Sequence, residues 1–198
     1  MIDPAEVERV FRDAGAFREG HFVLASGKHS PRYLEKFRVL QWPRETERLC
    51  GAIAGAVRGA DVDTVAGPTT GGIILAHEVA RQLGTRAVYA ERDDDGTGRV
   101  FRRGFRLGPD ERVLVVDDIM TTGGSVQETI DAVRAAGANV IAAAVLVDRS
   151  AGATKLGVPF HALWSVDIPT YAPEECPLCA RGIAAIHPGT TPAPVASR

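Results

Sequence analysis

The sequence has few cysteines, no long apolar run and little net charge, and each shortage argues against a class of protein. Three cysteines among 198 residues are too few for the disulfide framework of a small secreted domain, and the odd number favours a reducing cytoplasm. No stretch of about 18 apolar residues could span a membrane, and the opening M-I-D-P-A-E-V-E-R-V lacks the basic and apolar regions of a signal peptide. A formal net charge of −2 gives no support for binding nucleic acid or membrane surfaces. We therefore expect a cytoplasmic protein with neither as a partner.

The composition that remains is globular, with 45% hydrophobic residues in a length typical of one domain. Apolar runs and helical spacings follow one another along the chain. Strands are predicted at residues 62–66, 86–90, 113–116, 139–147 and 160–166. Helices are predicted at residues 4–14, 44–58, 73–83 and 126–136.

The most informative stretch is residues 112–125, R-V-L-V-V-D-D-I-M-T-T-G-G-S. Its apolar run predicts one buried strand of a parallel sheet. Asp117 and Asp118 end that strand, where two carboxylates are costly unless they face a cleft and bind something. Residues 121–125 then offer hydroxyls and backbone N–H groups at the start of a helix, where open α/β sheets bind phosphate. The stretch therefore predicts a site for ribose hydroxyls or magnesium beside a site for a phosphate monoester.

This order of residues resembles the phosphoribosyl-pyrophosphate (PRPP) motif of type I phosphoribosyltransferases. The resemblance implies that the two aspartates hold the ribose 2′ and 3′ hydroxyls and that the turn holds the 5′-phosphate. The PRPP-binding residues implied in this motif are Asp117, Asp118, Ile119, Met120, Thr121, Thr122, Gly123, Gly124 and Ser125. The alternative is an ordinary strand-to-helix turn in which an aspartate caps the helix.

A second glycine-rich turn, G-P-T-T-G-G at residues 67–72, also follows a predicted strand and opens a helix. In the family, the equivalent loop binds the pyrophosphate of PRPP. Some members carry a lysine within it, whereas this chain has Thr70 and Gly71, so backbone N–H groups would make the contact. Alternatively, the glycines serve only the close packing of helix on sheet.

The pattern F-x-L-x-S-G-x-x-S-P-x-Y at residues 22–33 is similar to the base-binding hood of orotate phosphoribosyltransferases. There Tyr33 would cover the base, with Lys36 as a nearby cation. Ala25 departs from the family, which often has a basic residue before the Ser-Gly pair. For Lys28 and Lys36, each taken alone, simple solvation is the alternative.

Arg149 follows the predicted strand at 139–147 and corresponds in the family to the arginine that binds the orotate carboxylate. Thr121 would also contact orotate. The alternative for Arg149 is an ordinary arginine at the end of a strand.

Residues 91–104, E-R-D-D-D-G-T-G-R-V-F-R-R-G, contain a stretch at 93–98 that should be exposed and mobile. In orotate phosphoribosyltransferases, a loop here closes over the site and brings cations to the leaving pyrophosphate. Arg92 would be its catalytic and PRPP-binding cation, and Arg99, Arg102 and Arg103 are further candidates. The loop has no lysine, and arginine cannot serve as a general acid near neutral pH. The family also implies a homodimer in which this loop acts in trans.

The resemblance implies an α/β fold with a mainly parallel sheet flanked by helices. It implies a single domain over residues 1–188, with a hood from about 15–38 plus 160–187 and a flexible tail at 189–198. The catalytic residues would be Arg92, Asp117 and Asp118, and the only cofactor Mg²⁺ carried by PRPP, with no direct protein ligand. The reaction would be orotate plus PRPP giving orotidine 5′-monophosphate and pyrophosphate. A transferase for another base, such as a purine, and a non-catalytic PRPP-sensing regulator are the rivals.

Near the C-terminus, P-E-E-C-P-L-C contains a C-x-x-C pair formed by Cys176 and Cys179. With His187 and Cys50, these residues could form a zinc site if the fold brought them together. The alternative is a purely structural segment, because a second cysteine pair is absent.

Overall fold

A computed structural model of the chain describes residues 2–150 and 152–188, so the tail predicted at 189–198 lies outside the described residues. A six-stranded sheet has the strand order β5-β4-β3-β6-β7-β8. Its strands are β3 (Thr64–Pro68), β4 (Arg86–Arg92), β5 (Arg99–Phe101), β6 (Arg112–Met120), β7 (Asn139–Asp148) and β8 (Phe160–Ser165). All neighbours are parallel except β4 and β5, so the predicted mainly parallel α/β fold is confirmed.

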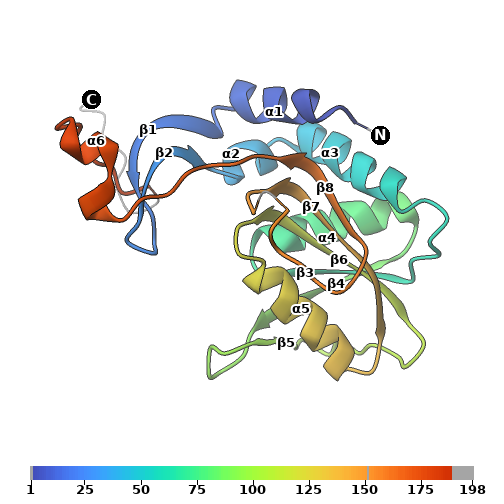
Figure 1. Cartoon of the computed structure of the whole chain (residues 1–198). Coiled ribbons are helices and arrows are strands. Elements are labelled where there is room, and N and C mark those ends of the chain that lie inside the picture. The colour runs from blue at the N-terminus through green and yellow to red at the C-terminus, as the bar shows by residue number, and fades with distance from the viewer. Residues whose placement is uncertain (1, 151, 189–198) are drawn as a thin grey trace, which may run out of the picture.

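Helices cover both faces of this sheet (Figure 1). The helices are α1 (Pro4–Asp13), α2 (Phe37–Leu40), α3 (Pro43–Ala56), α4 (Gly71–Leu83) and α5 (Gly124–Ala135). The alternation of side chains along β6 builds two cores: Leu114 and Val116 pack with residues of α1, α3 and α4, while Val113 and Val115 pack with residues of α5. Among the described residues, no helix combines the length and apolar content needed to cross a bilayer.

A small lobe, here called the hood, stands beside the sheet (Figure 1). It consists of the antiparallel pair β1 (Phe17–Val23) and β2 (His29–Leu34) with the C-terminal segment 171–186, which includes η1 (Pro173–Glu175) and α6 (Pro177–Ala180). That segment is bound to both strands, through bridges between His29 and Tyr171 and between Phe22 and Ile186. The expected start of the C-terminal part at residue 160 is wrong, because β8 pairs with β7 in the main sheet.

The stretch 91–104 is more ordered than the sequence predicts. β4 continues to Arg92 and β5 pairs with it antiparallel, so the segment forms a hairpin. Its turn is closed by Asp93, whose carboxylate accepts hydrogen bonds from the N–H and the hydroxyl of Thr97 at 2.9 and 3.3 Å. Residues 94–97 of the turn are exposed, as expected. Phe101 packs against the core under α5, which explains why the charged segment forms a strand.

Candidate active site

Asp117 and Asp118 lie near the carboxyl end of strand β6, and both are almost completely buried, at 6% and 1% exposure. The Asp117 carboxylate accepts a hydrogen bond from the N–H of Asp118 at 2.8 Å, and Asp118 accepts one from the N–H of Ile119 at 2.6 Å. Lys36, next to the hood, places its ammonium 2.9–3.0 Å from both oxygens of Asp118. The pair is therefore fixed by its own backbone, and one of its members has a cationic partner.

The surroundings of the pair oppose a double negative charge. Burial, followed by repulsion from Asp118, raises the pKa of Asp117 to about 7. Burial also raises the pKa of Asp118, although Lys36 acts in the opposite direction. Near neutral pH the pair therefore retains part of a proton, which suits contacts to hydroxyl groups of a ligand.

The turn after β6 has the geometry of an anion site. Gly123 has φ 84°, and a Cβ there would meet Thr154 Cγ2 at 2.5 Å, so the position requires glycine. α5 begins immediately afterwards and leaves its first N–H groups free for a ligand. A cavity of about 70 Å³ lies here, lined by Asp117, Ile119, Met120, Thr121, Thr122, Gly123, Gly124, Ser125 and Val126. The structure thus brings every residue predicted for the PRPP motif into the lining of this cavity except Asp118, whose carboxylate is bound by Lys36 instead.

The loop between β3 and α4 lies directly against the acidic pair. A Cβ at Gly71 would collide with Asp118 Oδ2, and a Cβ at Gly67 would collide with the carbonyl of Gly72. These glycines therefore serve close packing, which was the alternative interpretation of the loop. Thr70 precedes α4 and is exposed, so the N-terminus of this helix still faces outward beside the PRPP motif.

Arg99 connects the two loops from a buried position, with 8% exposure. Its guanidinium donates to the Thr69 hydroxyl at 3.2 Å and to the Ser125 hydroxyl at 3.4 Å, and Glu128 lies 3.2 Å from its Nε. Burial lowers the pKa of Arg99 and Glu128 opposes that effect, but an arginine remains charged. On the sequence alone, Arg99 was one of several candidate loop arginines. Because it lies on β5, its guanidinium contacts both turns.

The other hairpin arginines are bound to nearby acids. Arg92 is 57% exposed, donates to the Gly96 carbonyl at 3.3 Å and lies 3.8 Å from Glu128. Arg102 pairs with Asp94 at 2.7 Å, and Arg103 pairs with Glu91 at 2.9 Å. Within the described part of this chain, none of the three contacts the PRPP motif.

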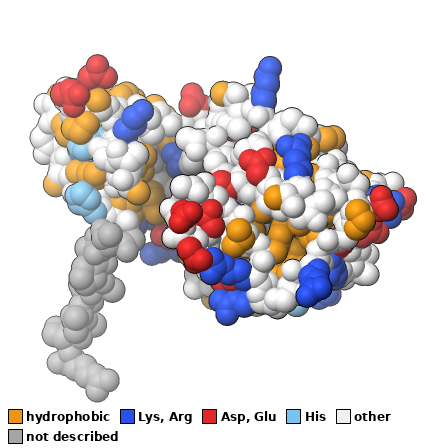
Figure 2. All heavy atoms as spheres, turned by 90° about the horizontal axis from the view of Figure 1, so that it is seen from below, with side chains coloured by type: hydrophobic (Ala, Val, Ile, Leu, Met, Phe, Trp, Pro, Cys, Tyr) orange, Lys and Arg blue, Asp and Glu red, His pale blue; other side chains and the backbone are white. Residues whose placement is uncertain are grey.

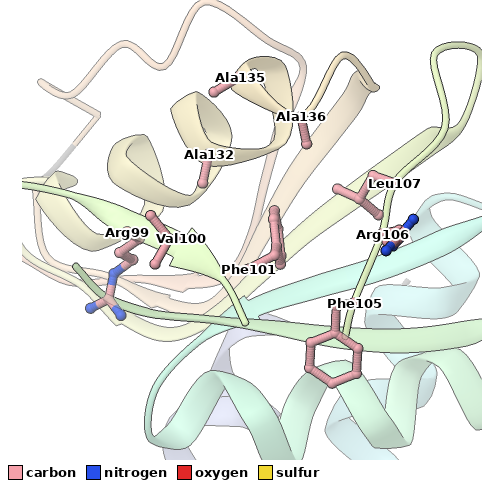
Figure 3. Close-up of a pocket in the computed structure, with 9 residues that line it drawn as sticks. All are labelled: Arg99, Val100, Phe101, Phe105, Arg106, Leu107, Ala132, Ala135 and Ala136. Atoms are coloured by element: carbon pink, nitrogen blue, oxygen red, sulfur yellow. The ribbon is translucent and has the colours of Figure 1, made fainter. Parts of the chain in front are cut away.

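A pocket of about 450 Å³ lies on the far side of β5 (Figure 3). Its walls are mainly apolar and include Val100, Phe101, Leu107, two alanines of α5 and Ala136, which follows that helix. The Arg99 guanidinium points away from these walls in Figure 3. This pocket is therefore separate from the anion site.

A larger cavity, of about 530 Å³, joins the hood to the PRPP motif. Its lining residues are Leu24, Ala25, Ser26, Lys28, Thr121, Thr122, Arg149, Ile168 and Thr170. Burial lowers the pKa of Arg149, and the Tyr33 phenol opposes that effect. Arg149 and Thr121, both predicted to contact orotate, thus line one cavity.

Tyr33 lies close enough to Arg149 for the two side chains to interact electrostatically, and its contact with the base stays a prediction. It does not line this cavity; its ring packs on Phe22, with centroids 5.7 Å apart. Burial raises the pKa of its phenol, and Glu35 adds to that effect. Conversely, no sequence signal singled out Thr170, and simple solvation was the favoured interpretation of Lys28. The only signal for Lys28 was its place beside the Ser-Gly turn of the hood pattern.

Charged side chains of both signs share the face shown in Figure 2, with hydrophobic atoms exposed between them. That face has no continuous basic patch. The positive charge near the site comes instead from individual side chains, the buried or half-buried Lys36, Arg99 and Arg149 and the exposed Lys28.

Comparison with known proteins agrees with this geometry. The family model described as phosphoribosyl transferase domain matches residues 38–158. The fold, the acidic pair and the anion turn thus define the class as a phosphoribosyltransferase.

Curated relatives specify the branch. An orotate phosphoribosyltransferase of Pelotomaculum thermopropionicum is 49% identical over 93% of this chain and 96% of its own. One of Thermotoga maritima is 44% identical over 93% and 97%. The crystal structure of orotate phosphoribosyltransferase from Aeropyrum pernix aligns with a TM-score of 0.68 and 32% identity, covering 81% of this chain and 93% of that chain. The chain belongs to the orotate phosphoribosyltransferase family.

Proposed function

We propose that the protein transfers the 5-phosphoribosyl group of PRPP to orotate, giving orotidine 5′-monophosphate and pyrophosphate in pyrimidine biosynthesis. The observation that carries this proposal is the cavity that Thr121 and Thr122 of the PRPP motif share with Arg149 and Lys28. A carboxylated base placed there meets two cations beside the sugar-phosphate site. Neither cation suits an uncharged purine, which disfavours the rival transferase.

The phosphate end of PRPP is assigned to the first turn of α5. Its 5′-phosphate would accept hydrogen bonds from backbone N–H groups and hydroxyls of residues 121–125. Asp117 lines the same small cavity, and it would accept hydrogen bonds from the ribose hydroxyls. Asp118 would join it if Lys36 moved away.

The leaving pyrophosphate is assigned to the space between the two loops. Arg99 lies beside that space and donates hydrogen bonds to Thr69 in one loop and Ser125 in the other. The N-terminus of α4 at Thr70 and Gly71 would add backbone N–H groups. Positive charge in a largely dry position stabilises the negative charge that develops as the pyrophosphate leaves. Arg99 thereby becomes the principal cation contributed by this subunit.

The chemistry is a displacement at the anomeric carbon through an oxocarbenium-like state. The nitrogen of an acidic base is the nucleophile, so positioning and neutralisation of charge matter more than general-base help. Mg²⁺ would arrive on the pyrophosphate oxygens of PRPP and neutralise them. Both oxygens of Asp118 already lie within 3.0 Å of the Lys36 ammonium, which fits an ion held by the substrate rather than by this carboxylate.

Arg92 is proposed to act in trans in a cytoplasmic homodimer. Its side chain is more than half exposed, and it extends from a hairpin that projects away from the sheet (Figure 1). Within its own subunit it meets Glu128 and the hairpin backbone, rather than the PRPP motif. A second subunit offers the site to which such a hairpin could deliver a cation.

The test is an assay of purified protein with PRPP, Mg²⁺ and a panel of bases containing orotate, adenine, hypoxanthine and uracil. Orotate alone should release pyrophosphate, and removal of the divalent cation should abolish the release. Turnover of a purine with none of orotate would overturn the substrate. PRPP binding without turnover of any base would favour the regulator.

A further inference from the structure

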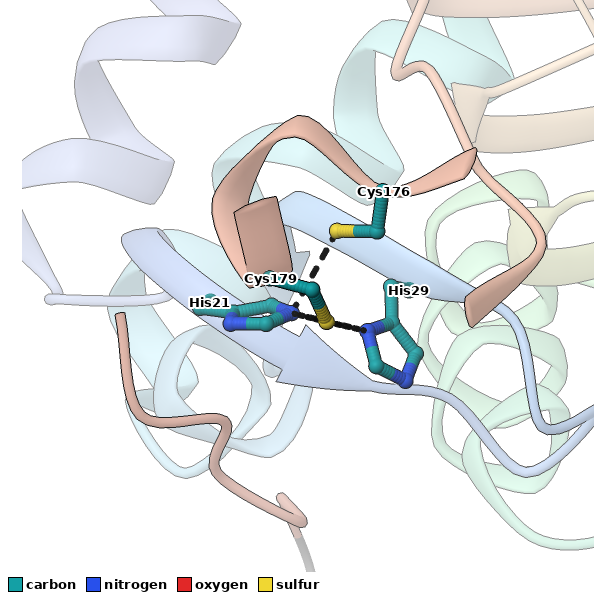
Figure 4. A group of neighbouring side chains, drawn as sticks. All are labelled: His21, His29, Cys176 and Cys179. Atoms are coloured by element: carbon teal, nitrogen blue, oxygen red, sulfur yellow. Dashed lines mark hydrogen bonds between the residues drawn. The ribbon is translucent and has the colours of Figure 1, made fainter. Parts of the chain in front are cut away.

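Four potential metal ligands meet inside the hood (Figure 4), and none of them lines the larger cavity or the anion site. His21 lies on β1, His29 on β2, and Cys176 and Cys179 flank the start of α6. One ligand atom from each residue lies within 4.8 Å of all the others. His21, His29 and Cys176 are buried, at 2%, 9% and 2% exposure. We propose that these four side chains bind one structural Zn²⁺ ion.

The separations of the ligand atoms fit a tetrahedral ion. Zn–S bonds of about 2.3 Å and Zn–N bonds of about 2.0–2.1 Å place sulfur and nitrogen about 3.5 Å apart in a tetrahedron. Cys176 Sγ lies 3.5 Å from His21 Nε2, and Cys179 Sγ lies 3.7 Å from the same nitrogen and 3.2 Å from His29 Nδ1. The two imidazole nitrogens, 2.8 Å apart, need only a slight separation to admit the ion.

The orientation of His21 points to the same conclusion. Its Nδ1 lies 2.7 Å from the carbonyl oxygen of Ile183 and must donate to it. In the neutral ring this leaves Nε2 with a lone pair, directed at the two sulfurs. Metal-bound histidines characteristically have such a carbonyl on the opposite nitrogen.

The charge of the site also balances. Two thiolates and two neutral imidazoles around Zn²⁺ have no net charge, which suits a buried position. Binding would release the two thiol protons. The closed set of four protein ligands leaves no open position for a substrate, so the ion is structural.

This ligand set differs from the one considered on the sequence. Cys50 belongs to the hydrophobic core beneath the sheet, and His187 lies outside the group of four. The histidines come from the strands of the hood, 155 residues before Cys176 in the case of His21. No local spacing could identify them.

The ion would fasten the C-terminal segment to the hairpin at a point next to the larger cavity. His29 and Tyr171 exchange backbone hydrogen bonds of 2.9 Å, and their chain neighbours Lys28 and Thr170 both line that cavity. Zinc binding should therefore hold Lys28 and Thr170 in place. This consequence rests on the proposed function, whereas the metal site itself does not.

The experiment measures zinc in the full-length, untagged protein, purified under reducing conditions without chelator, by inductively coupled plasma mass spectrometry. We expect about one zinc per chain. Cys179→Ser, which changes the exposed ligand, and His29→Ala should reduce this to near zero. Cys50→Ala and His187→Gln, the matched controls, should retain it.

Cobalt substitution supplies a readout of geometry in the wild-type chain. Co²⁺ should give the intense visible absorption of a tetrahedral ion and a thiolate charge-transfer band that is lost in Cys179→Ser. A reduced, folded wild-type protein without zinc, or a disulfide joining Cys176 to Cys179 in that protein, would overturn the proposal. So would zinc that survives loss of Cys179 but not of Cys50 or His187. Failure of orotate turnover in a zinc-loaded protein would overturn only the proposed function.

Discussion

Replacement of Asp117 by asparagine should stabilise the protein while removing activity. Burial and Asp118 raise the pKa of Asp117 from 3.8 to about 7, so the folded protein holds a proton that the unfolded chain releases. The stability provided by this proton is complete below about pH 3.8 and is lost progressively as the pH rises to about 7. Asparagine keeps the acceptor for the N–H of Asp118 and never ionises.

The magnitude follows from the pKa difference. Three pH units at about 1.4 kcal/mol each give at most about 4 kcal/mol. The free energy of unfolding of Asp117→Asn should thus match wild type near pH 4, exceed it increasingly between pH 4 and 7, and keep a constant advantage above pH 7. The gain reflects a carboxylate held for ligand binding at a cost in stability.

Urea unfolding followed by circular dichroism, at several pH values from 4 to 8, measures this difference. Asp131→Asn is the matched control, because Asp131 is an exposed carboxylate on α5, and the stability difference should stay within about 0.5 kcal/mol at every pH. A loss of stability in Asp117→Asn, or a gain that does not vary with pH, would refute the reasoning. Retained activity would show that the carboxylate is not part of the site.

Three further predictions concern the arginines of the proposed site. Arg149→Ala should raise the KM for orotate roughly ten- to a hundred-fold, because a charge-assisted contact is lost, while the KM for PRPP should change little. Steady-state kinetics measure both constants, and an equal rise in the two KM values would contradict the role of Arg149 in binding the carboxylate. Arg99→Lys should lower kcat substantially, because a single ammonium cannot replace the guanidinium that contacts both Thr69 and Ser125. An unchanged kcat would show that Arg99 has no role in the reaction. Arg92→Ala and Asp118→Asn should each be nearly inactive, and refolding the two variants together should restore activity through heterodimers with one intact site. If no activity returns, or if light scattering shows a monomer, Arg92 does not act at the site of a second subunit.

The strands of the main sheet other than β5, and the helices that cover it other than α2, were predictable because each has a local signal. An apolar run that ends in two acidic residues predicts the strand β6, and the two glycines after it predict the turn that opens α5. The strand, the turn and the helix were therefore all expected at the right place. Alternate residues of β6 then pack on opposite helical layers, as a strand buried on both faces must. The order of these parts along the chain was enough to identify the PRPP motif.

Contacts between distant segments could not be predicted in this way. Lys36 reaches Asp118 across 82 residues, and nothing near Lys36 distinguishes it from a solvated lysine. Arg99 is buried because β5 pairs with β4, whereas the sequence around it, with three aspartates and two glycines, is typical of an exposed loop. Tyr33 was predicted to cover the base, and the packing of its ring on Phe22 of the neighbouring strand had no signal in the sequence.

Two of the charges in the proposed site are already paired with groups of this chain. Lys36 contacts Asp118, and Glu128 contacts Arg99. PRPP can supply new partners for both the cations and the acids. Its phosphates can replace the carboxylates around Lys36 and Arg99, and its hydroxyls can replace the ammonium beside Asp118. Binding would then exchange one set of partners for another, and no buried charge would be left without compensation. An uncharged nucleoside offers hydroxyls without phosphates, so it would separate Lys36 from Asp118 while giving the ammonium no new partner. The pairing therefore favours the phosphorylated substrate through the cost that it imposes on ligands lacking phosphate.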